Sequence, residues 1–411
     1  MNSAKLFRAS CVALIVTAMS FALRGDAMGH WATEFSLTNE QVGWVSGTAF
    51  WGFTLAMLFG GPLCDVLGMS RIVGLAWVGH LAGILMTIFA WNYWSLFFGT
   101  LLFGIANGLV EAACNPLITA LYPNDKTTKL NHFHAWFPGG IVIGGLLAFG
   151  LGKIELGWKV QFAVMLLPTL IYGLMFFRQP FPQTERVSQG ISTGAMFKAC
   201  LNPIFLLLVV CMLMSASTEL GTNQWIPNIL SHAGVSGVLV LVWITGLMWL
   251  GRQCAGTFVH RLSPLGTLLA SSALSALGLY AMSHTTGPML FASATVFAIG
   301  VCFFWPTMLG YANERFPSTG ALGLAILGGA GMLSVSFVLP TMGHYYDAGI
   351  AERTGGTGAI TPAIQAEAGL EMLGKVAVLP VILFVIFLLL LLARPKNQTP
   401  AVHNSTASVN H

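Results

Sequence analysis

Charged side chains are scarce in this chain. Asp, Glu, Lys and Arg make up 8% of its 411 residues, against roughly 25% in soluble domains. Hydrophobic residues reach 55% and the mean hydropathy is +0.77. Such a composition excludes a soluble domain with a solvated surface. In such a chain the net charge of +4 says little about acidic partners, and we expect no nucleic-acid partner.

Sequence patterns of catalysis and metal binding are also missing. The seven cysteines are scattered singly, mostly within apolar stretches, and form no C-x-x-C pair. They therefore indicate small hydrophobic side chains rather than a metal or disulfide set. No nucleophile–base pair and no phosphate-binding loop appears. We expect no enzymatic activity, no metal and no resident cofactor.

Long apolar runs fill most of the chain. They recur at lengths that cross about 30 Å of hydrocarbon, and they predict an all-α membrane protein of twelve transmembrane helices. The expected spans are 8–30, 41–64, 72–91, 94–121, 131–152, 159–178, 200–228, 236–258, 264–284, 287–313, 320–345 and 371–393. Arg24 and Asp26 interrupt the first run and no small-residue cleavage site follows it, so we expect a retained helix rather than a signal peptide.

The positions of Lys and Arg predict the orientation, because cytoplasmic segments are enriched in both. With the N-terminus inside, the cytoplasmic segments hold Lys5, Arg8, Arg71, Lys126, Lys129, Arg178, Arg186, Lys198, Arg261, Arg315, Arg394 and Lys396. The opposite side holds Lys153, Lys159, Arg353 and Lys375. Both termini are therefore expected in the cytoplasm. We expect a monomeric multi-pass protein of the cell membrane, surrounded by lipid, with a bacterial inner membrane as its location.

A polar connection divides the predicted helices six and six. Residues 179–199 would link an N-terminal bundle, 1–178, to a C-terminal bundle, 200–394, and 395–411 would form a cytoplasmic tail. Residues 346–370 are rich in Gly and Ala and are expected to form an outer loop before the last helix.

The two halves also echo each other in sequence. The Tyr-Pro pair at Tyr122 has a counterpart in the Phe-Pro pair at Phe316. Trp31 and Trp225 are separated by the same number of residues as these two pairs. Together with the central connection, these pairs indicate a duplicated six-helix unit.

The turn after the second run has the pattern Gly61-x-x-x-Asp65-x-x-Gly68-x-x-Arg71. It resembles the cytoplasmic signature of the major facilitator superfamily. This resemblance implies two pseudo-symmetric six-helix bundles around a central cavity that opens to each side alternately. It also implies a gating role for the turn, in which Asp65 holds a helix end and Arg71 pairs across the bundles. The alternative is an ordinary solvated turn.

Glu111 is the only charged residue between Leu101 and Tyr122, an almost wholly apolar stretch. A carboxylate near the middle of a bilayer costs roughly 2.5–3.5 kcal/mol on insertion scales, so it indicates a functional site. Asn115, one turn later, shares its helix face. The alternative for Glu111 is a structural ion pair with Arg24.

Two segments carry a closer resemblance. Residues 108–116 (GLVEAACNP) and 130–140 (LNHFHAWFPGG) resemble the fucose–galactose–glucose:proton symporter family. In that family an acid on the fourth helix serves sugar binding or proton coupling, and a glutamine on the fifth hydrogen-bonds the substrate. The resemblance assigns the acid to Glu111 and the glutamine position to His134. The family's acid on the first helix is matched approximately by Asp26.

Polar side chains at helical spacing predict the remaining site residues. The candidate proton-coupling acids are Glu111, Asp26 and Glu219. The candidate substrate contacts combine hydrogen-bonding groups with aromatic faces, which suits a sugar. They are Asn115, Asn131, His134, Asn223 and Gln224, with Trp136, Trp225 and Trp305 as stacking surfaces.

These observations predict a secondary active transporter that takes up a hexose-like sugar together with protons. Sodium is the alternative coupling ion. A proton-driven exporter of drugs or metabolites is disfavoured, because the fifth run (PGGIVIGGLLAFGLG) lacks the Gly-Pro order of such exporters. A non-transporting sensor would need a signalling domain, and none is recognisable. An anionic substrate is disfavoured because only Arg24 and Arg252 lie within the spans and Arg24 is expected to be paired.

Overall fold

The computed structural model describes residues 2–123, 126–183, 193–253, 262–355 and 358–393. Within these ranges all regular elements are helices. Among the described residues, eleven segments are long and apolar enough to cross a membrane, and Gly237–Arg252 is a shorter apolar helix. The predicted all-α membrane architecture is confirmed. The predicted tail, 395–411, lies outside the described residues.

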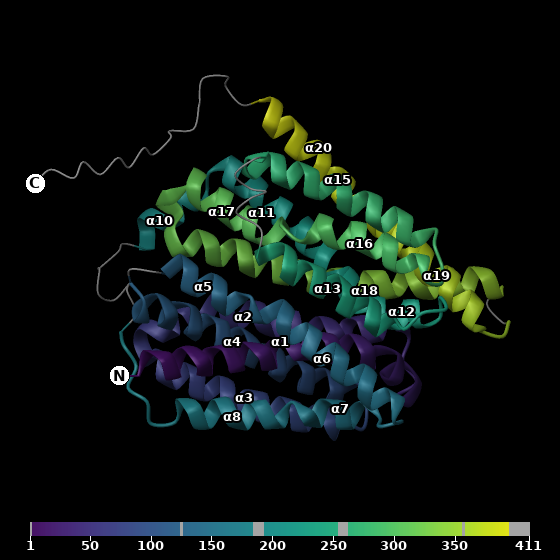
Figure 1. The fold of residues 1–411 in the computed structure, drawn as a ribbon, viewed down its shortest axis with the longest axis horizontal. Helices are drawn as coiled ribbons and strands as arrows, with labels where there is room; N and C mark the ends of the chain where they lie inside the picture. Colours follow the sequence, from purple (N-terminus) through teal and green to yellow (C-terminus); the bar gives the residue numbers. More distant parts are fainter. Residues whose placement is uncertain (1, 124–125, 184–192, 254–261, 356–357, 394–411) are drawn as a thin grey trace, which may run out of the picture.

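The N-terminal half forms one layer of the molecule, coloured purple to blue in Figure 1. Its helices are α1 (Ser3–Glu34), α2 (Asn39–Leu67), α3 (Met69–Ile88), α4 (Tyr93–Leu121), α5 (Lys126–His134), α6 (Trp136–Lys153), α7 (Trp158–Val164) and α8 (Leu166–Phe176). Side-chain caps fix where α2 and α4 begin, because Thr38 and Asn92 each form a capping box.

The C-terminal half forms the second layer, coloured teal to yellow (Figure 1). It starts with α10 (Thr193–Cys200), α11 (Pro203–Ala216), the π-helical turn η1 (Ser217–Gly221), α12 (Thr222–Ser231) and α13 (Gly237–Gln253). It continues with α15 (Pro264–Ser283), α16 (Met289–Val301), α17 (Phe304–Arg315), the 3-10 turn η2 (Pro317–Thr319), α18 (Gly320–Thr354), α19 (Pro362–Val376) and α20 (Val378–Leu392).

Four of the predicted spans are interrupted helices, and a proline follows each interruption. The breaks between α5 and α6, α7 and α8, α16 and α17, and α19 and α20 precede Pro138, Pro168, Pro306 and Pro380 by a few residues. Proline lacks the N–H that would bond the carbonyl four residues earlier, and its ring clashes with that carbonyl. The first break matters most for the site, because His134 is the last residue of α5.

The segment expected to be an outer loop, 346–370, is mostly helical. Helix α18 runs to Thr354 and ends at Gly355 in a left-handed conformation (φ 59°), and α19 starts at Pro362. The Gly/Ala-rich composition suggested a loop, but alanine is the strongest helix former. The segment contains the end of α18 and the start of α19. Arg353 joins them through ion pairs to Glu367 (3.2 Å) and Glu371 (2.9 Å).

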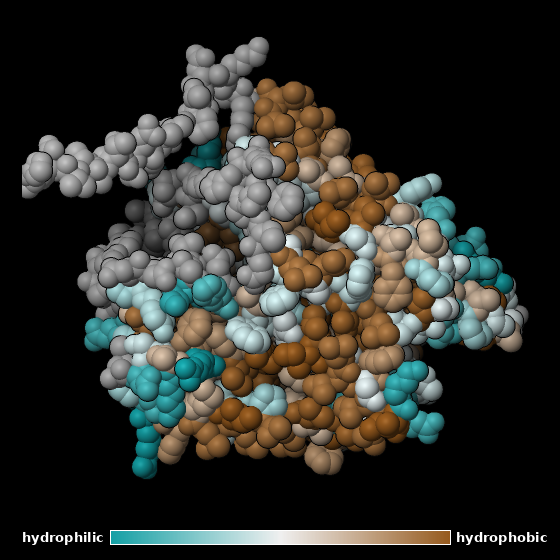
Figure 2. Space-filling model, in the orientation of Figure 1, coloured by the Kyte–Doolittle hydropathy of each residue, from teal (hydrophilic) through white to brown (hydrophobic). Residues whose placement is uncertain are grey.

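The surface matches a lipid environment. In Figure 2 hydrophobic residues cover the middle of the visible face, and hydrophilic residues gather toward its two ends. Large apolar side chains are exposed on several helices, among them Phe59 on α2, Leu174 on α8 and Leu389 on α20. Such side chains are stable at a surface only when it faces hydrocarbon or another protein.

The two halves meet closely along α2 and α18. Gly43 lies directly against the backbone of Leu339 and Pro340, and Gly343 lies against Asn39. Glycine permits this approach, because a Cβ at either position would collide with backbone atoms. Helix α1 crosses the molecule before α2 starts. These contacts therefore hold the two halves together at the end of the molecule opposite to the start of α1.

Candidate functional site

Glu111, Asn115 and His134 form a connected polar group in the N-terminal half. The Asn115 side chain hydrogen-bonds the Glu111 carboxyl one turn earlier on α4. His134 Nε2 hydrogen-bonds Asn115 Oδ1 at 3.0 Å. Because the amide oxygen only accepts, the imidazole donates this bond from Nε2. The two sequence segments that suggested a symporter-like site therefore meet in space through Asn115.

The side chains of this polar group are not fully buried. His134 is exposed, and Glu111 and Asn115 are half-buried although both lie inside the ends of α4. The arrangement suits groups that exchange protons or meet a solute.

The C-terminal half contributes an ion pair. Glu219 lies in the π-helical turn η1 and is 5% exposed. Arg252 Nη2, at the end of α13, lies 3.3 Å from Glu219 Oε1, and Arg252 Nε donates to the Cys302 carbonyl at 3.1 Å. π-Helical turns are uncommon and occur frequently at functional sites. Here the turn presents an acid to an arginine of a neighbouring helix.

The two polar groups lie on either side of the boundary between the halves. The charge of Arg252 acts on His134, although no hydrogen bond or ion pair joins these two side chains among the described residues. We call Glu111, Asn115, His134, Arg252 and Glu219 together the central polar chain. The structure thus brings together four residues predicted from the sequence and adds Arg252. Its place within a predicted span was the signal in the sequence for Arg252.

Asp26 lies elsewhere in the N-terminal half. Its nearest polar neighbours are His30, on the same helix, and Gln161 of α7. The structure therefore does not bring Asp26 to the central polar chain. Its predicted role in proton coupling stays a prediction.

Arg24 does not pair with Glu111. Its Nε donates to Gln224 Oε1 at 2.9 Å, and Gln224 Nε2 donates to the Phe21 carbonyl at 3.0 Å. Gln224, predicted to bind substrate, thus bridges α12 of one half to α1 of the other. The guanidinium also lies over the rings of Phe21 and Phe50.

The predicted aromatic surfaces are placed in three different ways. Trp225 is fully buried, donates to the Leu339 carbonyl at 3.2 Å and packs edge-on against Tyr346, which makes it a core residue of the C-terminal half. Trp136 starts α6 and is 43% exposed. Trp305 packs over Gly331 beside Ala216, and Ala216 precedes Glu219 by three residues.

The remaining predicted contacts are less informative. Asn223 is 4% exposed and its Oδ1 lacks a hydrogen-bond partner among the described residues. The side chain of Asn131 lies outside the described residues.

The turn between α2 and α3 matches its predicted geometry in part. Gly68 has φ 85°, a conformation that glycine adopts without strain. Gly61 has open space around it, and Arg71 is exposed in the first turn of α3. The side chain of Asp65 lies outside the described residues, so the gating role of these four residues stays a prediction.

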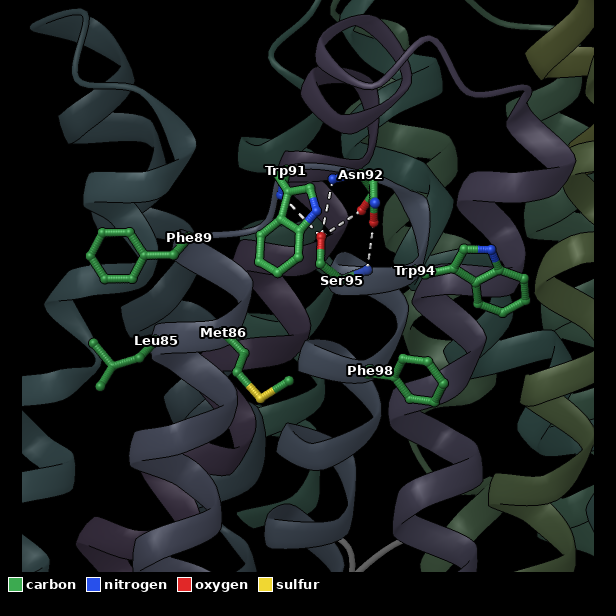
Figure 3. A pocket seen from close by; sticks show the side chains of 8 residues that line it. All are labelled: Leu85, Met86, Phe89, Trp91, Asn92, Trp94, Ser95 and Phe98. Carbon is green, nitrogen blue, oxygen red and sulfur yellow. Dashed lines mark hydrogen bonds between the residues drawn. The ribbon is translucent and has the colours of Figure 1, made fainter.

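A surface depression at the ends of α3 and α4 is a poor candidate for the site. Figure 3 shows its lining, which is Leu85, Met86, Phe89, Trp91, Asn92, Trp94, Ser95 and Phe98. Among these residues, hydrogen bonds join the Ser95 hydroxyl to the backbone of Trp91 and Asn92, and the Ser95 N–H to the Asn92 side chain, and they form the cap of α4. Exposed tryptophans at helix ends are typical of the membrane interface.

The fold and the central polar chain together define a helical membrane transporter. Residues 10–339 match the Major Facilitator Superfamily, and the chain belongs to that family. It is a transporter and not an enzyme. The match confirms the resemblance drawn from the turn at Gly61 to Arg71, whereas the narrower resemblance to the fucose–galactose–glucose symporters remains a prediction.

Curated relatives are moderately similar. The chain is 27% identical over 270 residues to the cis,cis-muconate transport protein of Acinetobacter baylyi, covering 61% of this chain and 65% of that protein. It is 25% identical over 232 residues to the gentisate transporter of Corynebacterium glutamicum, covering 51% of this chain and 50% of that protein. The chain thus matches only one half to two thirds of these relatives' lengths.

Solved structures share the fold. The D-xylose–proton symporter superposes with a TM-score of 0.76 at 13% identity, covering 92% of this chain and 97% of that chain. A bacterial homologue of the human lysosomal transporter Spinster, in an inward-facing and unoccupied conformation, superposes with a TM-score of 0.75 at 17% identity, covering 94% and 96%. At such identities the similarity shows the fold alone.

Proposed function

We propose that this protein takes up a small polar organic solute together with protons by alternating access. The observation that carries the proposal is the central polar chain, which places a carboxyl of one half, Glu111, and a carboxyl of the other, Glu219, on either side of the boundary between the halves. Acids inside membrane-spanning helices mark proton relays and substrate paths in transporters.

The charges of the central polar chain suggest how proton and solute are coupled. Arg252 is paired with Glu219 and its charge acts on His134, so a positive charge on His134 alters how strongly Arg252 holds Glu219. A proton on Glu111 removes the charge that Asn115 stabilises and changes the orientation that Asn115 imposes on His134. Protonation in one half is thereby transmitted to the ion pair of the other half.

The conformation supports alternating access. The halves are in close contact at the end where α2 starts and α18 ends, where Asn39 and Glu40 bond Asp347. With both termini in the cytoplasm, as the Lys and Arg distribution predicts, the closed end is the outer one. We propose that the protein acts in the cell membrane as a monomer.

The solute is predicted to be a sugar, because Asn115 and His134 supply the donors and acceptors that hydroxyl groups need. Relatives named for muconate and gentisate add organic acids as a second class. Both classes are polar organic molecules.

Uptake by purified protein in proteoliposomes tests the proposal. A panel of glucose, xylose, glucuronate and benzoate is offered with an inward proton gradient, with and without a protonophore. We expect one of these solutes to accumulate and the protonophore to abolish its accumulation. Accumulation that survives the protonophore but requires sodium instead of choline would identify sodium coupling, and loading against the proton gradient would identify an exporter.

A further inference from the structure

Arg24 is a buried arginine at the boundary between the halves. It lies on α1 and is 2% exposed. Its Nε is held by the amide oxygen of Gln224, which belongs to the opposite half. The residue next to it, Gly25, lies against the Gln224 carbonyl and Pro227, so α1 and α12 are in close contact here.

The positive charge of Arg24 lacks a counter-ion among the residues that the structure describes. No carboxylate pairs with it there, and its Nη2 is buried without a hydrogen-bond partner. Buried charges in proteins are normally paired, because an uncompensated charge loses its hydration without return. A neutral amide satisfies one edge of the guanidinium and leaves Nη2 unused.

Aromatic rings hold the guanidinium without neutralising it. The Arg24 Cζ lies 4.8 Å from the ring centroid of Phe21 and 5.1 Å from that of Phe50. Phe21 in turn packs edge-on against Phe137 of α6. Ring faces attract a cation and keep its orientation, while an apolar surrounding strengthens its attraction for an anion. The site is therefore preorganised to receive a negative group.

The second arginine within the spans differs in this respect. Arg252 is paired with Glu219 at 3.3 Å, so its charge is compensated by the protein itself. An incoming anion would have to displace Glu219 there, whereas at Arg24 it would meet an unused donor.

We propose that Arg24 binds the carboxylate of the transported solute, which makes the solute an organic carboxylate. This inference rests on the proposed transport function and names its substrate class. The guanidinium donates from Nη2 to a carboxylate oxygen, in the planar geometry that suits this pair. Because Gln224 comes from the opposite half, parting of the halves at this end removes Gln224 and exposes the guanidinium edge to the solute.

Matched pairs of probes test the substrate class on the unmodified protein. Glucuronate and glucose differ by a carboxylate on a sugar ring, and benzoate and benzyl alcohol by a carboxylate on an aromatic ring. We expect at least one carboxylate to raise the unfolding temperature of the purified protein and to undergo counterflow in proteoliposomes, with its neutral partner weaker by on the order of 30-fold. The responding pair identifies the solute body as a sugar or an aromatic ring. Equal responses within both pairs, or no response to either carboxylate, would overturn the inference.

Variants connect this preference to Arg24. We expect Arg24→Gln to weaken carboxylate binding by on the order of 30-fold and Arg24→Lys to restore part of it. Arg8→Gln removes an exposed charge from the same helix and should leave binding unchanged. Should Arg24→Gln fail to fold, the paired probes on the unmodified protein still decide the outcome.

Counterflow separates this inference from the transport proposal, since it needs no gradient. Carboxylate counterflow combined with protonophore-insensitive uptake would leave the Arg24 assignment standing and overturn proton coupling. Proton-coupled uptake of glucose equal to that of glucuronate would leave proton coupling standing and overturn the Arg24 assignment.

Discussion

His134 Nε2 donates a hydrogen bond to Asn115 Oδ1 at 3.0 Å, which ties the end of α5 to the middle of α4. Asn115 also hydrogen-bonds Glu111, so one amide relates an acid and an imidazole that are 23 positions apart in the chain. An amide between two titratable groups makes the hydrogen-bonding state of one depend on the other. The charge of Arg252, whose partner is Glu219, also acts on His134.

Replacing Glu111 by glutamine should separate solute exchange from solute accumulation. Gln keeps the size and a hydrogen-bond acceptor for Asn115 but cannot carry a proton. We expect accumulation in an imposed proton gradient to fall to the level seen with a protonophore, while counterflow persists. The control is Glu352→Gln, which removes an exposed carboxylate from α18. Unchanged accumulation in Glu111→Gln would mean that this acid is structural.

Removing the acid of the buried ion pair should destabilise the C-terminal half. Glu219 is nearly buried and Arg252 is about a quarter exposed, so Glu219→Gln leaves an arginine that is only partly hydrated. We expect a loss on the order of 2 kcal/mol, below the value for a fully buried pair, visible as a lower unfolding temperature in detergent. The double variant Glu219→Gln with Arg252→Gln should recover part of the loss. Additive losses in the double variant would show that the two side chains do not interact.

Asp347 should help to hold one end of the molecule closed. Its carboxylate accepts hydrogen bonds from the backbone N–H of Asn39 (3.2 Å) and of Glu40 (2.9 Å) and from the Asn39 side chain (2.9 Å), all at the start of α2. An anion at a helix N-terminus is favoured by both the unpaired N–H groups and the helix dipole. We expect Asp347→Ala to weaken closure by roughly 2 kcal/mol.

Reactivity of a buried position measures this closure. Ser336 faces Gly47 between α18 and α2 and is fully buried. A cysteine placed there, with the native cysteines replaced, should react with a water-soluble maleimide faster when Asp347→Ala is also present. Thr341→Ala, an exposed change on the same helix, is the control. Equal rates with and without Asp347→Ala would contradict a closing role.

His80 should be a structural residue of the N-terminal half. It is fully buried, with Nδ1 at 2.9 Å from the Tyr172 hydroxyl and Nε2 at 2.9 Å from Asn107 Oδ1. Asn107 Nδ2 donates onward to Ser20 Oγ at 3.2 Å. His80→Leu leaves two buried polar groups without a partner, which costs roughly 2–4 kcal/mol. Thermal unfolding should show that loss while proton coupling of the remaining folded protein is unchanged; a selective loss of coupling would place His80 in the proton path.

The sequence predicted the helices well, because apolar length alone determines which segments can span a bilayer. It missed the internal breaks of the spans, although Pro138, Pro168, Pro306 and Pro380 marked them. It also underestimated the lengths of α18 and α19. A Gly/Ala-rich stretch is compatible with either a loop or a helix, and ion pairs such as Arg353–Glu371 (2.9 Å) stabilise the helices here.

The candidate site was predictable where neighbours share a helix face or a motif. Glu111 and Asn115 follow from their spacing, and His134 from the segment 130–140. Contacts between the halves could not be predicted, because no local pattern encodes which side chains meet across them. Arg252 near His134 and Gln224 on Arg24 are both of this kind.

Proton movement on addition of solute is the most direct test of proton coupling through the central polar chain. Proteoliposomes without any imposed gradient are given the solute that accumulates best from the panel of glucose, xylose, glucuronate and benzoate, and the external pH is recorded. We predict that protons enter with the solute, so that the external pH rises, and that Glu111→Gln abolishes the rise. No pH change with the unmodified protein, or an equal change with Glu111→Gln, would contradict coupling through the central polar chain.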